Sequence, residues 1–291
     1  MTVGECRNPF CLEPIKLQAQ FFGREAETRN VLNFLDHGQC VSVVGPARIG
    51  KTSFLFHMAA PHVRAKLRRA KEQVFVYLDG HSLANLAEGE CYIYIREEAI
   101  RQIKSEVAVG QDIGVQLEKL VRQTGSQTAY FGLRTLLQSA RELDLKLVIV
   151  LDHLDVLNQN RLLGEIFFSA LRSLHTSYEI AYLAASRSPI DRLDRICPDG
   201  PGSPFFNIFQ QISIGLLTDT ESRQLVATLP DLASARFPEA VIDCIIHLGH
   251  NEPHRLQRAG YIAFEIWQEK QKDLLVEHCE EIRRRFDRMR I

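Results

Sequence analysis

The stretch "GPARIGKTS", Gly45–Ser53, constrains the fold of this chain more than any other. It contains the pattern G-x4-G-K-[ST], ends the apolar run Cys40–Gly45, and precedes the apolar helical segment "FLFHMAA". A glycine-rich turn between a strand and a helix presents backbone N–H groups to phosphate oxygens, and the helix dipole adds to the attraction. The pattern therefore predicts a P-loop in an α/β protein.

Each position of this loop has an expected role. Lys51 is expected to reach the β- and γ-phosphates, and Thr52 to offer its hydroxyl to Mg²⁺. The nucleotide-binding residues that the motif predicts are Gly45, Pro46, Ala47, Arg48, Ile49, Gly50, Lys51, Thr52 and Ser53. A glycine-rich turn with an exposed lysine is the alternative. The sequence lacks an NKxD motif for reading guanine, so we expect ATP or ADP.

Four short apolar runs predict buried parallel strands, because they are β-branched and nearly continuous. They are Cys40–Gly45, Val74–Gly80, Leu147–Asp152 and Ile180–Ser186, with a fifth strand expected at Gln210–Gly215. Helical patterns lie between them, for example in "TAYFGLRTLLQSAREL". This alternation predicts an α/β fold with a parallel sheet and right-handed crossovers.

The composition changes near Leu216, after which only helical patterns follow. Thr218 with Glu221 three residues later predicts a capping box at the start of the first of these helices. The predicted domains are an N-terminal extension at 1–20, a P-loop α/β core at 21–215 and a small all-α lid at 216–291.

Acidic residues end the strand in "KLVIVLDHLDVL". Asp152 is expected beside the P-loop strand, holding Mg²⁺ directly or through water; capping the next helix is the alternative. The next position, where many ATPases keep the carboxylate that activates water, is His153. Asp155 either orients water or caps the following helix.

Charge and cysteine usage narrow the class of protein. The formal net charge of −1 gives no overall attraction to nucleic acid. The seven cysteines form no CxxC pair, which argues against a disulfide framework and a zinc site. The sequence shows neither a signal peptide nor an apolar run of the roughly 18 residues that span a membrane. We expect a soluble protein of the cytoplasm, without a membrane partner.

The segment "FFGREAETRNVLNFL", Phe21–Leu35, resembles the N-terminal signature of STAND-class ATPases, which are signal-transducing relatives of AAA+ proteins. The bacterial and archaeal branch is the most similar. The stretches "NPF", "DHLD", "AASR", "SPFFNIFQQISIGLLTDTE" and "GHNEPHRLQ" match the same pattern in the same order. The P-loop alone is typical of NTPases in general; the ordered set indicates this class over nearly the whole chain.

The resemblance implies further site residues. Phe22, Gly23 and Arg24 would line the adenine side of the nucleotide. Arg187 would be a sensor that reaches the γ-phosphate, unless it only forms a salt bridge to a strand-end carboxylate. Pro253 would pack on the nucleotide from the lid, although a proline at the first position of a helix is also ordinary.

Two positions depart from the family pattern. His153 replaces the usual Glu or Asp, and "GHNEP" is longer than the common Gly-x-Pro spacing. The family normally continues past the lid into a winged helix and further modules. We therefore expect either a standalone ATPase subunit or one domain of a larger protein.

Three functions fit these features. The first is a slowly hydrolysing ATPase switch, in which ATP and ADP set the angle between core and lid for a protein partner or a second copy. The second is a nucleic-acid-associated AAA+ ATPase that loads replication or transposition machinery. The third is a metabolic P-loop kinase. The catalytic residues expected for the first are Lys51, Asp152, His153, Asp155 and Arg187, with Arg192 and Arg195 as inter-subunit candidates.

Overall fold

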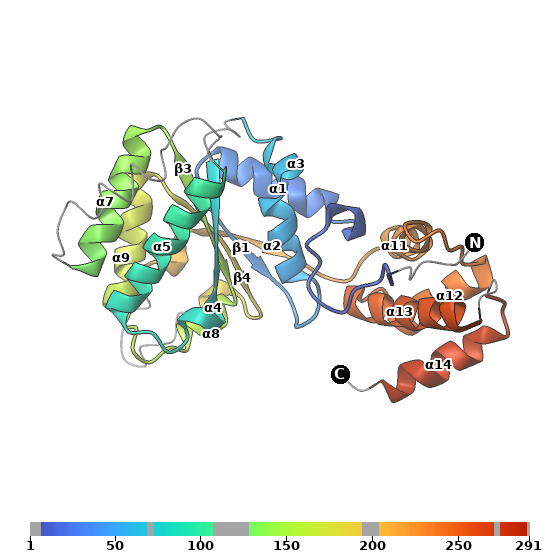
Figure 1. The fold of residues 1–291 in the computed structure, drawn as a ribbon. Coiled ribbons are helices and arrows are strands. Elements are labelled where there is room, and N and C mark those ends of the chain that lie inside the picture. Colours follow the sequence, from blue (N-terminus) through green and yellow to red (C-terminus); the bar gives the residue numbers. More distant parts are fainter. Residues whose placement is uncertain (1–6, 69–72, 107–127, 194–203, 271–273, 290–291) are drawn as a thin grey trace. The chain divides into compact units, whose positions relative to one another are not determined.

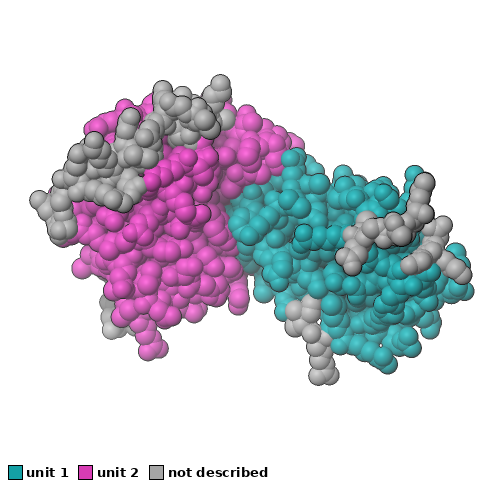
Figure 2. Space-filling view, viewed as in Figure 1, with its two compact units in different colours: residues 1–25, 46–57, 214–291 teal, residues 26–45, 58–213 magenta. Residues whose placement is uncertain are grey.

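The computed structural model describes residues 7–68, 73–106, 128–193, 204–270 and 274–289. The chain forms two compact units, which Figure 2 distinguishes. The helical unit consists of Met1–Glu25, Pro46–His57 and Ile214–Ile291, and the sheet unit of Ala26–Gly45 and Met58–Ser213. Each unit has a hydrophobic core of its own. The predicted domain limits of 1–20, 21–215 and 216–291 stay a prediction.

The sheet unit is built on five parallel strands in the order β2-β3-β4-β1-β5 (Figure 1). They are β1 (Cys40–Val44), β2 (Gln73–Asp79), β3 (Lys146–Asp152), β4 (Ala181–Ser186) and β5 (Phe209–Ser213). Every residue of β1 and β4 is buried, as expected for central strands covered on both faces. The predicted α/β fold with a parallel sheet is confirmed.

One expectation about this sheet is wrong. The strand that ends in Asp152 does not lie beside the P-loop strand, because β4 pairs with both β1 and β3 and separates them. The physical reason is the connection after β3. Consecutive strands tend to be neighbours in a sheet, so the short crossover from β3 places β4 next to it. Asp152, the last residue of β3, and Gly45, directly after β1, still lie at the same edge of the parallel sheet.

Helices cover the sheet within this unit. They are α1 (Glu25–Asp36), α3 (Pro61–Arg64), α4 (Gly80–Leu83), α5 (Glu88–Glu106), α7 (Ala129–Glu142), α8 (Leu154–Asn158), α9 (Glu165–Tyr178) and α10 (Ile190–Leu193), with a 3₁₀ turn, η3, at Phe206–Ile208. Figure 1 shows α5, α7 and α9 gathered on one side of the sheet. The predicted apolar face of α7 is buried there at Leu133, Leu136, Leu137 and Ala140.

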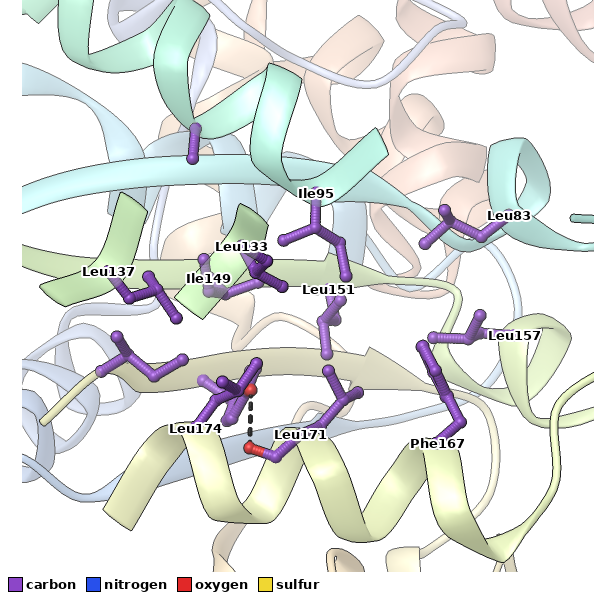
Figure 3. A pocket seen from close by; sticks show the side chains of 13 residues that line it. Leu83, Ile95, Leu133, Leu137, Ile149, Leu151, Leu157, Phe167, Leu171 and Leu174 are labelled. Carbon is purple, nitrogen blue, oxygen red and sulfur yellow. Dashed lines mark hydrogen bonds between the residues drawn. The ribbon is translucent and has the colours of Figure 1, made fainter. Parts of the chain in front are cut away.

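A cavity of about 10 Å³ lies in this core (Figure 3). Its lining includes Leu133, Ile149 and Phe167, and the side chains around it are apolar apart from one hydroxyl. That hydroxyl, of Tyr182, already donates to the carbonyl oxygen of Leu171 at 2.9 Å. A space of this size holds at most about one water, and an apolar one stays dry. It is a packing defect rather than a ligand site.

The helical unit contains α2 and the C-terminal helices. They are α2 (Lys51–Ala59, whose last two residues fall in the sheet unit), α11 (Asp219–Asp231), α12 (Glu239–Gly249), α13 (Pro253–Lys270) and α14 (His278–Arg288), with a 3₁₀ turn, η1, at Gln18–Gln20. The predicted capping box of Thr218 and Glu221 begins α11. Among the helices in the described ranges, none has the length and apolar character that a membrane span requires.

The N-terminal segment completes the core of the helical unit. Phe10 is 2% exposed and stacks on Phe237, with ring centroids 6.1 Å apart. Gly260 of α13 makes room for it, because a Cβ there would lie 2.1 Å from the Phe10 ring. The Asn8 amide donates to the carbonyl oxygen of Tyr261 at 3.0 Å. This segment is therefore part of the unit's hydrophobic core.

Candidate nucleotide-binding site

The P-loop from Pro46 to Ser53 lies in the helical unit, immediately before α2 and in its first turn. Arg48 has φ 64° and Gly50 has φ 95°, so the turn uses left-handed backbone that glycine adopts readily. The Lys51 ammonium donates to the carbonyl oxygen of Pro46 at 2.8 Å. The first N–H groups of α2 have no partner within the helix, which is the arrangement that binds phosphate.

The segment before α1 packs against α2 and forms a hydrogen bond with it. The Ile15 amide donates to the Ser53 hydroxyl at 2.9 Å. The Phe21 ring stacks on the His57 ring with centroids 4.1 Å apart. Ser53, predicted as a nucleotide-binding residue, therefore has a structural partner within the helical unit.

The three residues expected beside adenine lie against α11. Glu221 accepts a hydrogen bond from the Arg24 amide at 2.8 Å. The Arg24 side chain is buried and donates to the carbonyl oxygens of Gly215 and Leu216. A Cβ on Gly23 would lie 2.5 Å from the Glu221 carboxylate, and Phe22 packs on the core of the unit. These contacts give the segment a structural role, and the place of Phe22, Gly23 and Arg24 beside adenine stays a prediction.

Glu221 is the charged centre of these contacts. Burial would raise its pKa, but hydrogen bonds from Thr218 and from the Arg24 amide outweigh burial, so the pKa is lowered. The same carboxylate thus caps α11 and fixes the chain just before α1. The capping box was expected from sequence; the second use of Glu221 was not.

Pro253 is the first residue of α13, and His254, Arg255 and Arg258 follow it. Burial lowers the pKa of His254, and the positive charge of Arg48 lowers it further. Burial, Arg255 and Arg48 lower the pKa of Arg258 in the same way. The P-loop residue Arg48 thus shares a positively charged region of the helical unit with α13, which favours an anion such as a phosphate.

The basic residues at the start of α13 were not among the site residues predicted from the sequence. Their signal is the run "PHRLQR", whose first turn brings His254 and Arg255 directly after the proline. Arg255 and Arg258 also lie over the Phe286 ring of α14, 5.5 Å and 4.3 Å from its centroid. Packing on an aromatic ring keeps these charges in place without neutralising them.

Asp152 ends β3 in the sheet unit and is 1% exposed. One oxygen accepts from the Tyr77 hydroxyl at 2.9 Å, and the other accepts from the His153 amide at 2.9 Å. Burial and then the charge of Asp152 raise the pKa of Tyr77, so this hydroxyl keeps its proton. The hydroxyl and the amide hold this buried carboxylate in place. Its oxygens are the kind of ligand that Mg²⁺ prefers.

His153 follows in left-handed backbone, with φ 52°. Its Nδ1 lies 2.9 Å from Oδ1 of Asp79 and 3.7 Å from Oδ2 of Asp152. Sequence reasoning missed Asp79, which ends β2 opposite Asp152 in the strand register. The sequence does contain a signal for it, because each of two predicted strands has an aspartate at or next to its end, Asp79 and Asp152.

Arg187 directly follows β4 and pairs with Asp155 in the first turn of α8. The Arg187 amide donates to Asp155 Oδ1 at 3.3 Å, and the guanidinium Nε lies 4.0 Å from Oδ2. The Arg187 side chain is 61% exposed, so the pair contributes little to stability. The salt bridge considered from sequence is thus present, and the sensor role of Arg187 stays a prediction.

The structure gathers the predicted site residues in two groups. The helical unit holds Phe22, Gly23, Arg24, Pro253 and the loop from Pro46 to Ser53, and the sheet unit holds Gly45, Asp152, His153, Asp155 and Arg187. Gly45 donates its amide to the carbonyl oxygen of Ser186 at 3.3 Å. Thr52 and Asp152 belong to different units, so their joint use of one Mg²⁺ stays a prediction.

A P-loop between β1 and α2, a five-stranded parallel sheet and a helical C-terminal region are the features of a P-loop NTPase fold. The chain belongs to the novel STAND NTPase 1 family, whose model matches residues 15–283. This match confirms the STAND-class resemblance of the sequence. No curated protein matches the chain.

Solved structures share the fold. A Walker-type ATPase of Pyrococcus abyssi is 16% identical, with a TM-score of 0.64 over 96% of this chain and 75% of that chain. The ORC2 protein of Aeropyrum pernix, in its ADPNP–ADP complexes, is 15% identical, with a TM-score of 0.69 over 99% and 73%. Domain III of the replication initiation protein DnaA of Thermotoga maritima is 11% identical, with a TM-score of 0.58 over 97% and 99%. At these identities the likeness concerns the fold alone.

Proposed function

We propose that this NTPase binds ATP with Mg²⁺, hydrolyses it slowly, and uses its nucleotide state to control the docking of a protein partner or self-assembly. The observation that carries ATP binding is the P-loop turn, with Arg48 and Gly50 in left-handed backbone before the N-terminus of α2. Lys51 would contact the β- and γ-phosphates, and the positive charges of Arg255 and Arg258 on α13 support an anionic ligand.

In this proposal Thr52 and Asp152 are the residues that hold Mg²⁺. Hydroxyl and carboxylate oxygens are suitable ligands, and a bound Mg²⁺ would neutralise charge on the phosphates. Asp152 is fixed for such a role by the two hydrogen bonds that it accepts. Arg187 and Asp155 would act near the γ-phosphate, as sensor and as water-orienting residue.

Slow hydrolysis is supported by the environment of His153. A general base must lie within reach of the attacking water, and its help contributes about 10²–10⁴-fold. His153 replaces the carboxylate that many ATPases place there, and its Nδ1 already contacts Asp79. The contact leaves Nε2 as the ring nitrogen that could accept a proton, and a ring held toward Asp79 projects differently from the carboxylate that it replaces. We therefore expect ATP to remain bound for long periods.

A nucleotide-retention experiment tests this proposal. The protein is loaded with ATP labelled on the α-phosphate, which ATP and ADP both retain, in the presence of Mg²⁺, and the bound ATP and ADP are followed over time. Lys51→Ala should lose the bound nucleotide, whereas Lys66→Ala, which changes an exposed lysine outside the P-loop, should retain it. Wild-type protein that retains no labelled nucleotide would contradict nucleotide binding. Rapid conversion of the bound ATP to ADP would contradict slow hydrolysis and so the switch.

The alternative is a nucleic-acid-associated ATPase, and the C-terminal helix favours it most. Arg283, Arg284 and Arg288 are exposed on α14, while Arg285 pairs with Glu269. One structure of the same fold is the ORC1 protein of Aeropyrum pernix in complex with DNA, with a TM-score of 0.62 and 15% identity. A DNA affinity that falls steeply with salt and with loss of these arginines would favour this alternative.

A further inference from the structure

We propose that Asp79, His81 and His153 form a binding site for a zinc-class divalent metal ion in the sheet unit. One carboxylate oxygen of Asp79 and one ring nitrogen of each histidine all lie within 4.8 Å of one another. The argument rests on these three side chains and not on nucleotide binding, although His153 directly follows the expected Mg²⁺ ligand Asp152.

The site follows from the register of two neighbouring strands. Asp79 and Asp152 are partners at the ends of β2 and β3, so the turns after the two strands lie side by side. Gly80 allows the turns to touch, because a Cβ there would be 2.3 Å from the carbonyl oxygen of His153. The turn after β2 thus brings Asp79 and His81 to His153 on the turn after β3.

The distances nearly satisfy the geometry of a metal site. Ligands bind zinc at about 2.0–2.2 Å, so two ligands of one tetrahedral ion lie about 3.3–3.6 Å apart. The His153 Nδ1 and the Asp79 carboxylate are already 2.9 Å apart. The rings of His81 and His153 have centroids 4.6 Å apart. Because the His81 side chain is exposed, a small rotation brings its nitrogen within range.

The ligand types select the ion. Two imidazoles and one carboxylate suit zinc, cobalt and nickel, whereas Mg²⁺ prefers oxygen ligands alone. Three protein ligands also leave a position open for water. Asp79 and His153 are only partly exposed and His81 is exposed, so an ion enters from solvent. Cysteine spacing argued against a zinc site and could not indicate this one, because its ligands are two histidines and a carboxylate from two separate turns.

A cobalt titration tests the site without using activity. Nucleotide-free protein is titrated with Co²⁺ in excess Mg²⁺, and visible absorption reports the coordination of the ion. Wild type should bind one Co²⁺ with the intense bands of a four-coordinate nitrogen–oxygen site, and Zn²⁺ should displace it. Loss of second-shell partners alone costs about 10–100-fold in affinity, so His81→Ala should weaken binding more than tenfold.

Three controls make the result decisive. His37→Ala removes an exposed histidine at the opposite end of the sheet, just before β1, and should bind Co²⁺ like wild type. Lys51→Ala should also bind normally, which separates this site from nucleotide binding. His81→Gln should be as weak as His81→Ala, and both should melt like wild type without metal because His81 is exposed.

Two outcomes would overturn the proposal. If His81→Ala binds Co²⁺ as tightly as wild type, His81 is not a ligand. The contact between His153 and Asp79 is then an ordinary hydrogen bond and not part of a metal site. A thiolate-to-cobalt charge-transfer band in the near ultraviolet assigns the ion to cysteines instead. Cys244 and Cys279, which lie close together in the helical unit, are the candidates for that outcome.

Discussion

The Nδ1 atom of His153 lies 2.9 Å from Oδ1 of Asp79, joining the ends of two neighbouring strands. His153 has left-handed backbone and directly follows the buried carboxylate of Asp152. A residue that follows the expected Mg²⁺ ligand is thus fixed by a partner from another strand.

ATP with Mg²⁺ should stabilise the protein against heat. At a ligand concentration about 100 times Kd, binding to the folded state adds roughly 2.7 kcal/mol. Thermal melts with and without Mg-ATP measure this, and Lys51→Ala should remove the shift. If Lys51→Ala shifts as much as wild type, the P-loop is not the nucleotide site.

Phe10→Ala should strongly destabilise the helical unit. The ring is 2% exposed and packs on Phe237, and removing a buried phenylalanine ring costs about 3–5 kcal/mol. Trp267, the single tryptophan of the chain, packs against the same core, so its fluorescence in urea reports this unit. Leu17→Ala, at a residue 64% exposed in the same segment, should change stability by about 0.5 kcal/mol or less.

Acid should weaken the helical unit through Glu221. Its pKa in the folded protein lies below that of the unfolded chain. Its ionised form therefore stabilises the fold above the ordinary Glu pKa of about 4.3, and this contribution is lost as pH falls through the lowered value. Glu221→Gln should be less stable than wild type at neutral pH, and the difference should shrink in acid.

Trp267 fluorescence in urea, repeated across pH, follows this difference. Glu13→Gln removes an exposed carboxylate of the same unit and should follow the wild-type profile. A Glu221→Gln curve parallel to wild type down to low pH would show that the ionised carboxylate contributes no stability.

A non-hydrolysable ATP analogue should promote self-association if the nucleotide state controls assembly of copies. Arg192 is exposed on α10 and is the inter-subunit candidate in the described part of the chain; Arg195 lies outside it. Light scattering should show an increase in mass that Arg192→Ala prevents and Arg172→Ala, on the exposed face of α9, does not. A monomer with and without the analogue rules out self-association and leaves a protein partner.

Regular elements were predictable because their signals are local. Nearly continuous apolar runs indicated four of the strands, and a fifth was expected at the place of the largely exposed β5. Thr218 with Glu221 indicated the start of α11. The apolar spacing of α7 indicated the helix and its buried face. The P-loop sequence likewise indicated its own turn between β1 and α2.

Contacts between distant segments were not predictable from these signals. The position of β4 between β1 and β3 depends on how the crossovers pack, which periodicity does not record. Asp79 meets His153 only through the strand register, and Arg24 meets Glu221 only when α11 folds against the segment before α1. The partners of the candidate site residues therefore had to come from the structure.

Single-turnover ATP hydrolysis, with protein in excess over ATP in metal-depleted buffer supplied with Mg²⁺, tests slow turnover at His153 most directly. The wild-type rate constant should be well below about 1 s⁻¹, against roughly 1–10³ s⁻¹ for typical enzymes. His153→Glu should hydrolyse ATP faster, because a carboxylate can orient and deprotonate water, while His153→Ala should stay close to wild type. A brisk wild-type activity that His153→Ala abolishes would make the histidine the catalytic base and contradict a slow ATP-held switch.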